Sequence, residues 1–286
     1  MTLTTGMAEL GRELVRIGSA YSGKWTYALT DLGSGAHIGR DEDGVMPTAS
    51  LIKVPILVSL YRAVEDGRVG LADRIQYTQD HRCLGSGVLS RMTPGVEMTV
   101  RDAAVLMIII SDNSATNMMI DLVGLDQVNQ TMRDVGLAQT TLFRRLGDPG
   151  GGIDARKMSV STAGEMTRLL ELIALHEAVS EEASEDMLRL LRRQDYRHEL
   201  SRLLPWNEMN MLENHEVNWV AEKGGSFLNG VRTSGAVFCG PRGTFVMSAF
   251  CEGGTGEGTG REAEGNRVIG ELGYAAWRAL AAEGQR

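Results

Sequence analysis

The sequence predicts an α/β protein of the α+β sandwich kind. An antiparallel sheet is flanked by helices from the two chain ends, and an all-α region is inserted between them. Strand-like segments lie near both ends, one at Trp25–Leu32 and several, rich in Val, Phe and Thr, after Pro205. Helical patterns run from Thr48 to about Leu204, and amphipathic helical patterns open and close the chain. Because both ends combine helix and strand, they are expected to share one layer.

The predicted organisation is an α/β domain of residues 1–47 plus 212–286 and an inserted all-α domain of residues 48–211, with the active site between them. A chain of 286 residues buries roughly 75% of its unfolded surface, so a full core forms without disulfide staples.

The first elements follow from local patterns. In residues 7–21, Leu10, Leu14 and Ile17 fall on one face of a helix. Trp25–Leu32 is typical of a strand, and the glycine-rich turn after it leads toward a second short strand.

Six helices are predicted in the inserted region. Thr99 followed by Asp102 has the form of a capping box, which supports the start of the second of them. The predicted ranges are 50–66, 99–110, 113–123, 125–136, 162–175 and 181–193.

Strand patterns return after Pro205, followed by a glycine-rich loop and a last helix that turns Val268, Ile269 and Leu272 inward. The predicted strands are Val217–Ser226, Val231–Cys239 and Thr244–Cys251, and the loop is Gly253–Gly260.

Charge and hydropathy exclude several classes of partner. The chain has 29 Lys and Arg residues and 37 Asp and Glu residues, so its net charge is −8. This acidic balance argues against binding to nucleic acid or to an anionic membrane. No stretch approaches the roughly 18 consecutive apolar residues of a membrane span. The N-terminus lacks the basic and apolar regions of a signal peptide, so the chain as given is expected in the cytoplasm, or in the periplasm or outside the cell if it has been trimmed.

No metal or other cofactor is expected. The cysteines Cys83, Cys239 and Cys251 form no CxxC pair, and the five histidines form no HExxH or other paired ligand spacing. The expected partner is a small-molecule substrate, and the expected state is a monomer.

Ser50-Leu51-Ile52-Lys53 is an SxxK tetrad at the start of the first inserted helix. Residues three apart on a helix share a face, so the Lys53 amine can reach the Ser50 hydroxyl. Serine needs a base to become a nucleophile, and lysine serves as that base only when burial or a nearby positive charge lowers its pKa. Alone the tetrad is a weak signal, because any capping serine before a helix with a surface lysine matches it.

Two further motifs strengthen the signal. Ser111-Asp112-Asn113 lies between two predicted helices, and Lys223-Gly224-Gly225 lies on a predicted strand. Their order and placement match SxxK, SDN and KTG of class A β-lactamases and penicillin-binding proteins. The chain resembles the class A β-lactamase-like serine hydrolases of that superfamily almost end to end, including Gly85–Leu89 and Leu106–Asn117. The resemblance implies a β-lactamase/transpeptidase-like fold.

The resemblance also implies roles for the motif residues. Ser50 would be the acylated nucleophile and Lys53 its proton acceptor, directly or through water. Ser111 would pass a proton to the leaving group, helped by the charge of Lys223. Asn113 would hydrogen-bond the acyl side chain of the substrate.

Other residues would bind the reacting carbonyl and the far end of the substrate. The backbone N–H groups of Ser50 and Ser226 would form the oxyanion hole. Gly224, Gly225 and Arg232 would bind substrate, Arg232 at the place of a carboxylate-binding arginine, although it also fits a strand arginine that faces solvent. Gly224 departs from the family, because it replaces the Thr or Ser whose hydroxyl contacts the substrate carboxylate.

The glutamate that drives deacylation in class A β-lactamases is missing. Counting without gaps from Arg144 puts Leu146 at its position. Sliding by two residues puts Asp148-Pro149 there instead and Gly152 at the place of the family asparagine. Asp148 is thus a candidate deacylation base, one methylene shorter than glutamate.

The predicted function is a serine hydrolase that forms an acyl-enzyme with β-lactams or related amides and esters and deacylates weakly. A small-ester esterase or a D-alanyl peptidase is the alternative within the enzyme class. A non-catalytic β-lactam-binding sensor is the alternative outside it, favoured by the missing glutamate. A purely structural relative is disfavoured, because it gives no reason for the SxxK, SDN and KGG motifs to occur together.

Overall fold

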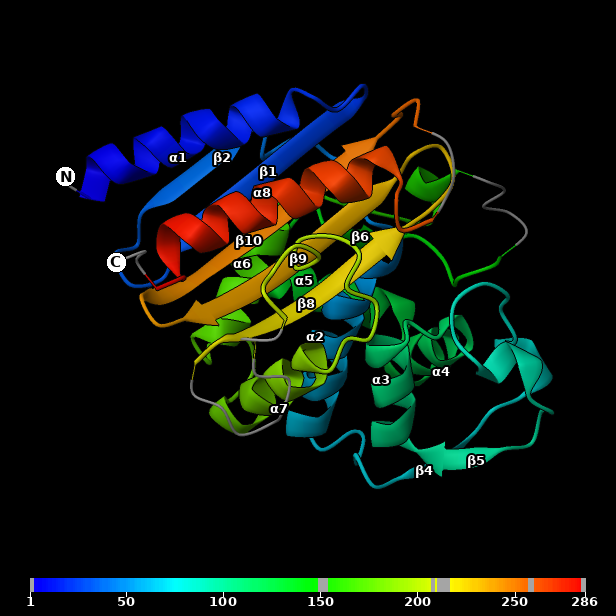
Figure 1. Cartoon of the computed structure of the whole chain (residues 1–286). Helices are drawn as coiled ribbons and strands as arrows, with labels where there is room; N and C mark the ends of the chain where they lie inside the picture. Colours follow the sequence, from blue (N-terminus) through cyan, green and yellow to red (C-terminus); the bar gives the residue numbers. More distant parts are fainter. Residues whose placement is uncertain (1–2, 149–153, 207–208, 210–216, 257–259, 284–286) are drawn as a thin grey trace.

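The computed structural model describes residues 3–148, 154–206, 209, 217–256 and 260–283. Its main feature is a five-stranded antiparallel sheet in the order β2-β1-β10-β9-β8, so strands from the two chain ends pair side by side (Figure 1). The strands are β1 (Lys24–Asp31), β2 (His37–Arg40), β8 (Trp219–Ser226), β9 (Arg232–Gly240) and β10 (Gly243–Glu252).

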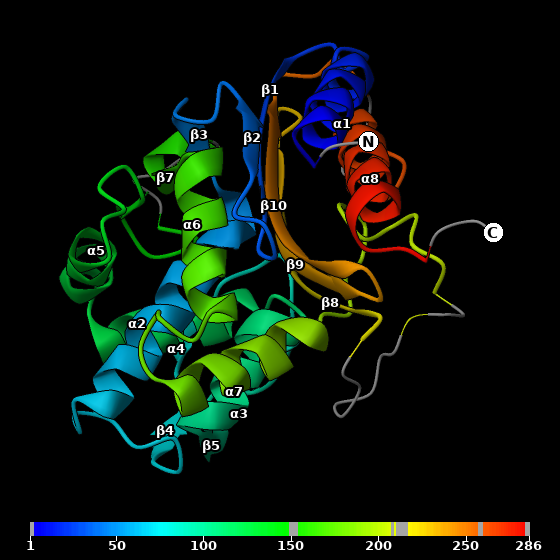
Figure 2. The ribbon, with the colours of Figure 1, turned by 90° about the vertical axis from the view of Figure 1, so that its left-hand side faces the viewer.

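One face of the sheet is covered by the helices of the two chain ends, α1 (Leu3–Gly18) and α8 (Glu264–Leu280), which lie side by side (Figure 2). Leu10, Leu14 and Ile17 are all buried there, as the sequence pattern predicts.

The opposite face carries the helical region (Figure 2). Helix α6 packs directly on β1, β9 and β10 and α7 packs on β8, while α2, α3, α4 and α5 lie farther from the sheet. The helices are α2 (Lys53–Glu65), α3 (Val100–Ile109), α4 (Asn113–Val123), α5 (Leu125–Asp134), α6 (Ala163–Ala174) and α7 (Glu181–Arg192). The predicted helices are therefore confirmed to within a few residues at each end. Thr99 caps α3 through the predicted capping box with Asp102.

The inserted region is not purely helical. It also contains the two-stranded antiparallel sheet β4-β5 and two strands of a three-stranded sheet, β3-β7-β6, whose third strand β3 directly precedes it. Strands of two or three residues are too short to show a period of two, so no sequence pattern predicts them. They are β3 (Met46–Pro47), β4 (Arg74–Gln76), β5 (Glu97–Thr99), β6 (Thr141–Leu142) and β7 (Ser159–Ser161), and the 3-10 turns are η1 (Ala49–Ile52), η2 (Gln79–His81), η3 (Leu89–Arg91) and η5 (Ala155–Lys157). The predicted domain boundary at 211/212 lies outside the described residues.

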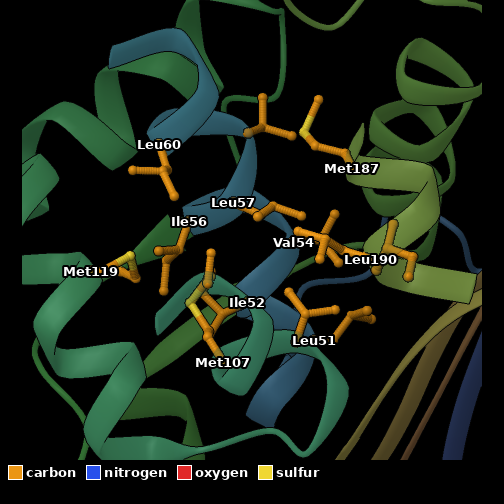
Figure 3. Close-up of a cluster of buried hydrophobic side chains, with 14 of the residues drawn as sticks. Leu51, Ile52, Val54, Ile56, Leu57, Leu60, Met107, Met119, Met187 and Leu190 are labelled. Atoms are coloured by element: carbon orange, nitrogen blue, oxygen red, sulfur yellow. The ribbon is translucent and has the colours of Figure 1, made fainter. Parts of the chain in front are cut away.

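Helix α2 runs through the core of the helical region (Figure 3). A helix that is apolar on all sides has to be buried, and every residue of α2 from Lys53 to Tyr61 is. Its neighbours come from α5, α4, α3 and α7. Figure 3 shows Ile56, Leu57 and Leu60 of α2 within this cluster, with Met107, Met119, Met187 and Leu190 around it. The start of α2 is thus held in a fixed place, and the SxxK tetrad is located there.

Within the described residues, no helix combines the length and the apolar composition that crossing a bilayer requires.

Candidate active site

Ser50 lies in the 3-10 turn η1, one turn before α2 begins at Lys53. The residue before it, Ala49, has a φ of 45°, in the left-handed region that a side chain rarely adopts. Such a conformation costs about 1–3 kcal/mol and persists where the surroundings impose it, commonly at functional sites. Ser50 itself is partly exposed and lines two adjoining cavities.

Lys53 is fully buried and points at the SDN motif. Its Nζ donates to the Ser111 carbonyl oxygen at 2.6 Å, to Ser111 Oγ at 2.9 Å and to Asn113 Oδ1 at 2.9 Å. The amine therefore joins the first motif to the second, and a proton can pass between Lys53 and Ser111 along a single hydrogen bond.

The electrostatics of Lys53 suit a base. Burial, reinforced by the positive charge of Lys223, holds the pKa of Lys53 well below its usual value, although the Asp112 carboxylate opposes the shift. A lowered pKa enlarges the fraction of neutral amine near neutral pH, and only the neutral amine can accept a proton.

The sign of this shift gives a prediction for the pH dependence of acylation. With an uncharged p-nitrophenyl ester, the rate should rise with pH and level off above the pKa of Lys53, which lies well below the ordinary lysine value of 10.5. The measurement is the rate of Ser50 labelling by mass spectrometry, followed between pH 5 and pH 10. A rate that still rises about tenfold per pH unit at the top of this range would contradict a depressed Lys53 as the base.

The SDN motif is positioned by its own middle residue. Asp112 caps α4 by accepting from the Ala115 N–H at 2.9 Å, and it also accepts from the N–H groups of Val88 at 2.6 Å and Leu89 at 2.9 Å. Its carboxylate thus ties the α3–α4 junction to the 85–89 loop. Ser111 has a φ of 55°, so the backbone of the site has a second residue, in addition to Ala49, in the left-handed region.

The loop that contacts the SDN motif requires glycine. At Gly85, where φ is +109°, a Cβ would lie 2.7 Å from Asn113 Nδ2. At Gly87, where φ is +96°, it would collide with the Asp112 carboxyl. The loop approaches the motif this closely only because both residues lack a side chain.

The KGG motif closes the site from strand β8. A Cβ at Gly225 would lie 2.8 Å from the Ser50 backbone nitrogen, so β8 runs directly beside the nucleophile turn. Lys223 is fully buried, and burial lowers its pKa to about 8 against the opposing effect of Glu199 and Glu222.

Two cavities meet at Ser50 and Ser226. One of about 190 Å³ extends toward the KGG motif, and one of about 250 Å³ extends toward Asn113. The first is lined by Ser50, Ser86, Ser111, Tyr196, His198, Glu199, Lys223, Gly224, Gly225 and Ser226. The second is lined by Ala49, Ser50, Cys83, Leu84, Gly85, Ser86, Asn113, Leu146, Gly147, Met158, Ser226 and Phe227. Lys53 joins this set through its hydrogen bonds to Ser111 and Asn113. The structure thus brings together eight of the predicted site residues: Ser50, Lys53, Ser111, Asn113, Lys223, Gly224, Gly225 and Ser226.

The structure does not bring Arg232 into this set. Along β9 successive side chains alternate between faces, and Thr233 points toward the nucleophile turn, where its Oγ1 donates to the Thr48 carbonyl oxygen at 2.7 Å. Arg232 therefore points to the α8 side, where its side chain lies against Gly265. It is neither in the described lining of the two cavities nor facing solvent, since it is 1% exposed.

The loop after the SDN helix places Leu146 at the cavity and Asp148 outside its described lining. Leu146 is held through both backbone groups by Asn117, whose Oδ1 accepts from the Leu146 N–H at 3.0 Å and whose Nδ2 donates to its carbonyl oxygen at 3.0 Å. Asp148 is exposed. This favours the ungapped count, in which a leucine takes the glutamate position. Gly152 and Pro149 lie outside the described residues.

Sequence reasoning missed three lining residues, Tyr196, His198 and Glu199. They come from the segment between α7 and β8, which contains no catalytic motif and no helical or strand period. No local signal in that segment announces its position beside Lys223.

Comparison with known proteins adds a family match. A model of the beta-lactamase enzyme family matches residues 9–280. The crystal structure of a beta-lactamase from Sphaerobacter thermophilus DSM 20745 superposes with a TM-score of 0.80 at 28% identity, covering 95% of this chain and 97% of that one.

Two curated relatives match over shorter stretches. Beta-lactamase L2 of Stenotrophomonas maltophilia is 27% identical over 161 residues, 56% of this chain and 53% of that protein. The beta-lactamase regulatory protein BlaB of Streptomyces cacaoi is 28% identical over 118 residues, 41% of this chain and 38% of that protein. The matches thus span about half or less of the curated relatives' own lengths.

Proposed function

Since the chain belongs to the beta-lactamase enzyme family and is a hydrolase of the β-lactamase type, we propose that it acts through an acyl-enzyme formed at Ser50, with β-lactams or related amides and esters as substrates. The observation that carries the proposal is the Lys53–Ser111 hydrogen bond of 2.9 Å inside a site that also contains Ser50 and Lys223.

In the acylation step, neutral Lys53 takes the Ser50 proton, directly or through water, while Ser50 Oγ attacks the carbonyl carbon. The N–H groups of Ser50 and Ser226 donate to the oxygen that becomes negative, which is worth roughly 3–4 kcal/mol for each donor. When the intermediate collapses, the bond to the leaving nitrogen or oxygen breaks and that atom takes a proton from Ser111. Lys53 returns its proton to Ser111, so the relay is restored and the acyl group remains on Ser50.

Release of the acyl group needs a water molecule and a base that removes its proton. Leu146 cannot serve as that base, and Asp148 is the candidate substitute in the same loop. We therefore expect acylation to be intact and hydrolysis of the acyl-enzyme to be the slow step.

A sensor that stays acylated is the second candidate function. The leucine at the cavity favours it, and so does the similarity to a relative that is named a beta-lactamase regulatory protein. A small-ester esterase or a D-alanyl peptidase shares the same acylation step and differs in the natural acyl group.

Intact-protein mass spectrometry after mixing with benzylpenicillin tests the proposal. An adduct of one penicillin on Ser50 that decays within minutes supports the hydrolase, and one that persists for hours supports the sensor. If no adduct forms, β-lactams are not substrates, and labelling by a p-nitrophenyl ester decides whether Ser50 is a nucleophile at all.

The relay gives a second prediction. Lys53→Ala and Ser111→Ala should each slow acylation at least about 10²-fold, because each removes one end of the same proton path. The double variant should lose little more than the worse single variant, since the two residues act as a unit. Rates are measured by stopped-flow with a chromogenic ester, with Lys24→Ala at the exposed start of β1 as the control. Effects that simply add would show that the two residues act independently.

A further inference from the structure

Glu199 is a buried acid that the mechanism above does not use. It lies in the segment between α7 and β8, whose backbone packs on α8. A Cβ at Gly270 would lie 3.2 Å from the Glu199 carbonyl oxygen, and one at Gly273 would collide with the carbonyl of Leu200. Two glycines of α8 thus allow this segment to lie flat on the helix, which fixes Glu199 beside β8.

The carboxyl group of Glu199 occupies the space of a side chain at position 224. A Cβ at Gly224 would lie 2.7 Å from Glu199 Cδ and 3.1 Å from Oε1. The KTG motif has a threonine at this position, and its hydroxyl would need the room that the carboxyl fills. Gly224 and Glu199 therefore form a matched pair, in which the side chain missing from the strand is replaced by one from a distant segment.

This carboxyl lines the active-site cavity and accepts a hydrogen bond from the His198 backbone, but one of its two oxygens lacks such a partner among the described residues. Glu199 is 5% exposed, it lines the cavity with Ser50 and Ser111, and its Oε2 has no hydrogen-bond partner among the described residues. A buried polar group without a partner costs about 1–3 kcal/mol. A ligand that supplies the partner recovers that cost, so the cavity beside the Glu199 carboxyl is a place for a substrate group.

The groups around Glu199 determine which substrate group fits. Glu222 and Lys223 face it from β8, Arg232 from β9 and His198 from its own segment. The Glu222 carboxylate is already engaged by the hydroxyls of Ser201 and Ser234.

Burial, reinforced by Glu222, raises the pKa of Glu199 to about 8, and burial lowers the pKa of Lys223 to about 8. The raised pKa favours the protonated carboxyl of Glu199, while Glu199 and Glu222 favour the charged form of Lys223. A protonated carboxyl beside an ammonium group provides two donors, and a substrate carboxylate is the acceptor that fits both.

We propose that Glu199 is a substrate-binding residue, whose carboxyl replaces the hydroxyl absent at Gly224 and, together with Lys223, binds a carboxylate on the leaving-group side of the scissile bond. This rests on the proposed acylation of Ser50.

The test compares two esters with the same phenylacetylglycyl acyl group, one with phenol and one with 3-hydroxybenzoate as the leaving group. The readout is the ratio of their Ser50 acylation rates at pH 7, carboxylate ester over plain ester. Glu199→Leu fills the same space without a donor and should lower this ratio at least about tenfold, the scale of a hydrogen bond to a charged group. Glu199→Gln keeps a donor and should retain most of the ratio.

A third variant checks the pairing with Gly224. Glu199→Ala combined with Gly224→Thr makes room for the threonine hydroxyl, so the ratio should recover toward the wild-type value. An equal loss of rate with both esters in Glu199→Leu, or the same ratio in the Leu and Gln variants, would overturn the inference while leaving Ser50 acylation standing. Failure of both esters to label wild-type Ser50 would instead overturn the proposed function, and this inference with it.

Discussion

Ser50→Ala is expected to abolish acylation by penicillins and by p-nitrophenyl esters, with a loss of at least about 10⁴-fold in the rate. The size of the loss follows from the chemistry, because the variant lacks the oxygen atom that forms the covalent ester. The measurement is labelling by a fluorescent penicillin together with ester turnover by the purified variant.

Ser59→Ala is the matched control for that variant. Ser59 lies on α2 nine residues after Ser50, and its buried hydroxyl donates to the Pro55 carbonyl oxygen at 2.8 Å within the same helix. It should keep labelling near the wild-type rate. A Ser50→Ala protein that is folded and still labelled near the wild-type rate would show that the nucleophile is another residue.

Leu146→Glu is expected to convert slow deacylation into fast turnover. With wild-type protein, β-lactam cleavage should show a burst of about one per Ser50 and then a slow phase, because Leu146 at the glutamate position cannot accept a proton. A glutamate at this cavity position can hold and deprotonate water, a contribution of typically 10²–10⁴-fold, so the slow phase should accelerate by about that factor. Stopped-flow with a chromogenic cephalosporin measures both phases.

Leu146→Gln is the control, since glutamine has the same shape and cannot accept a proton at neutral pH. If the Gln and Glu variants turn over at the same rate, general-base catalysis from this position is refuted. Wild-type progress curves that are linear and fast from the start would show that another residue already supplies the base.

Asp148→Asn completes this series, because it removes the other candidate base of the loop. The amplitude of the burst should be unchanged, and the rate of the slow phase should fall further only if Asp148 is that base.

The helical patterns were confirmed along the chain, and the three motifs come together as their order predicts. The reason is that these features are local. A helix shows its buried face every three or four residues, and SxxK places Ser50 and Lys53 one turn apart whatever surrounds them. The cap at Asp112 is also local, because it accepts from the N–H of Ala115 three residues later.

The direction of Arg232 could not be predicted in this way. Strand β9 is buried along its whole length, because α1 and α8 cover one face of the sheet and α6 covers the other. A strand covered on both faces has no alternation of polar and apolar residues, so its sequence does not tell which residues face the nucleophile. The structure places Thr233 on that side and Arg232 on the other.

The sequence alone was enough to predict the family, the helices and the residues proposed for acylation, because each motif and each helix depends on spacing within a short segment. Only the tertiary structure decided that Leu146 rather than Asp148 lines the cavity, and that Glu199 fills the space left by Gly224. Both outcomes depend on contacts between segments that are distant along the chain, such as Asn117 with Leu146 and Glu199 with Gly224. Close packing fixes such pairs by shape and charge in three dimensions, and no period or motif in either segment carries that information.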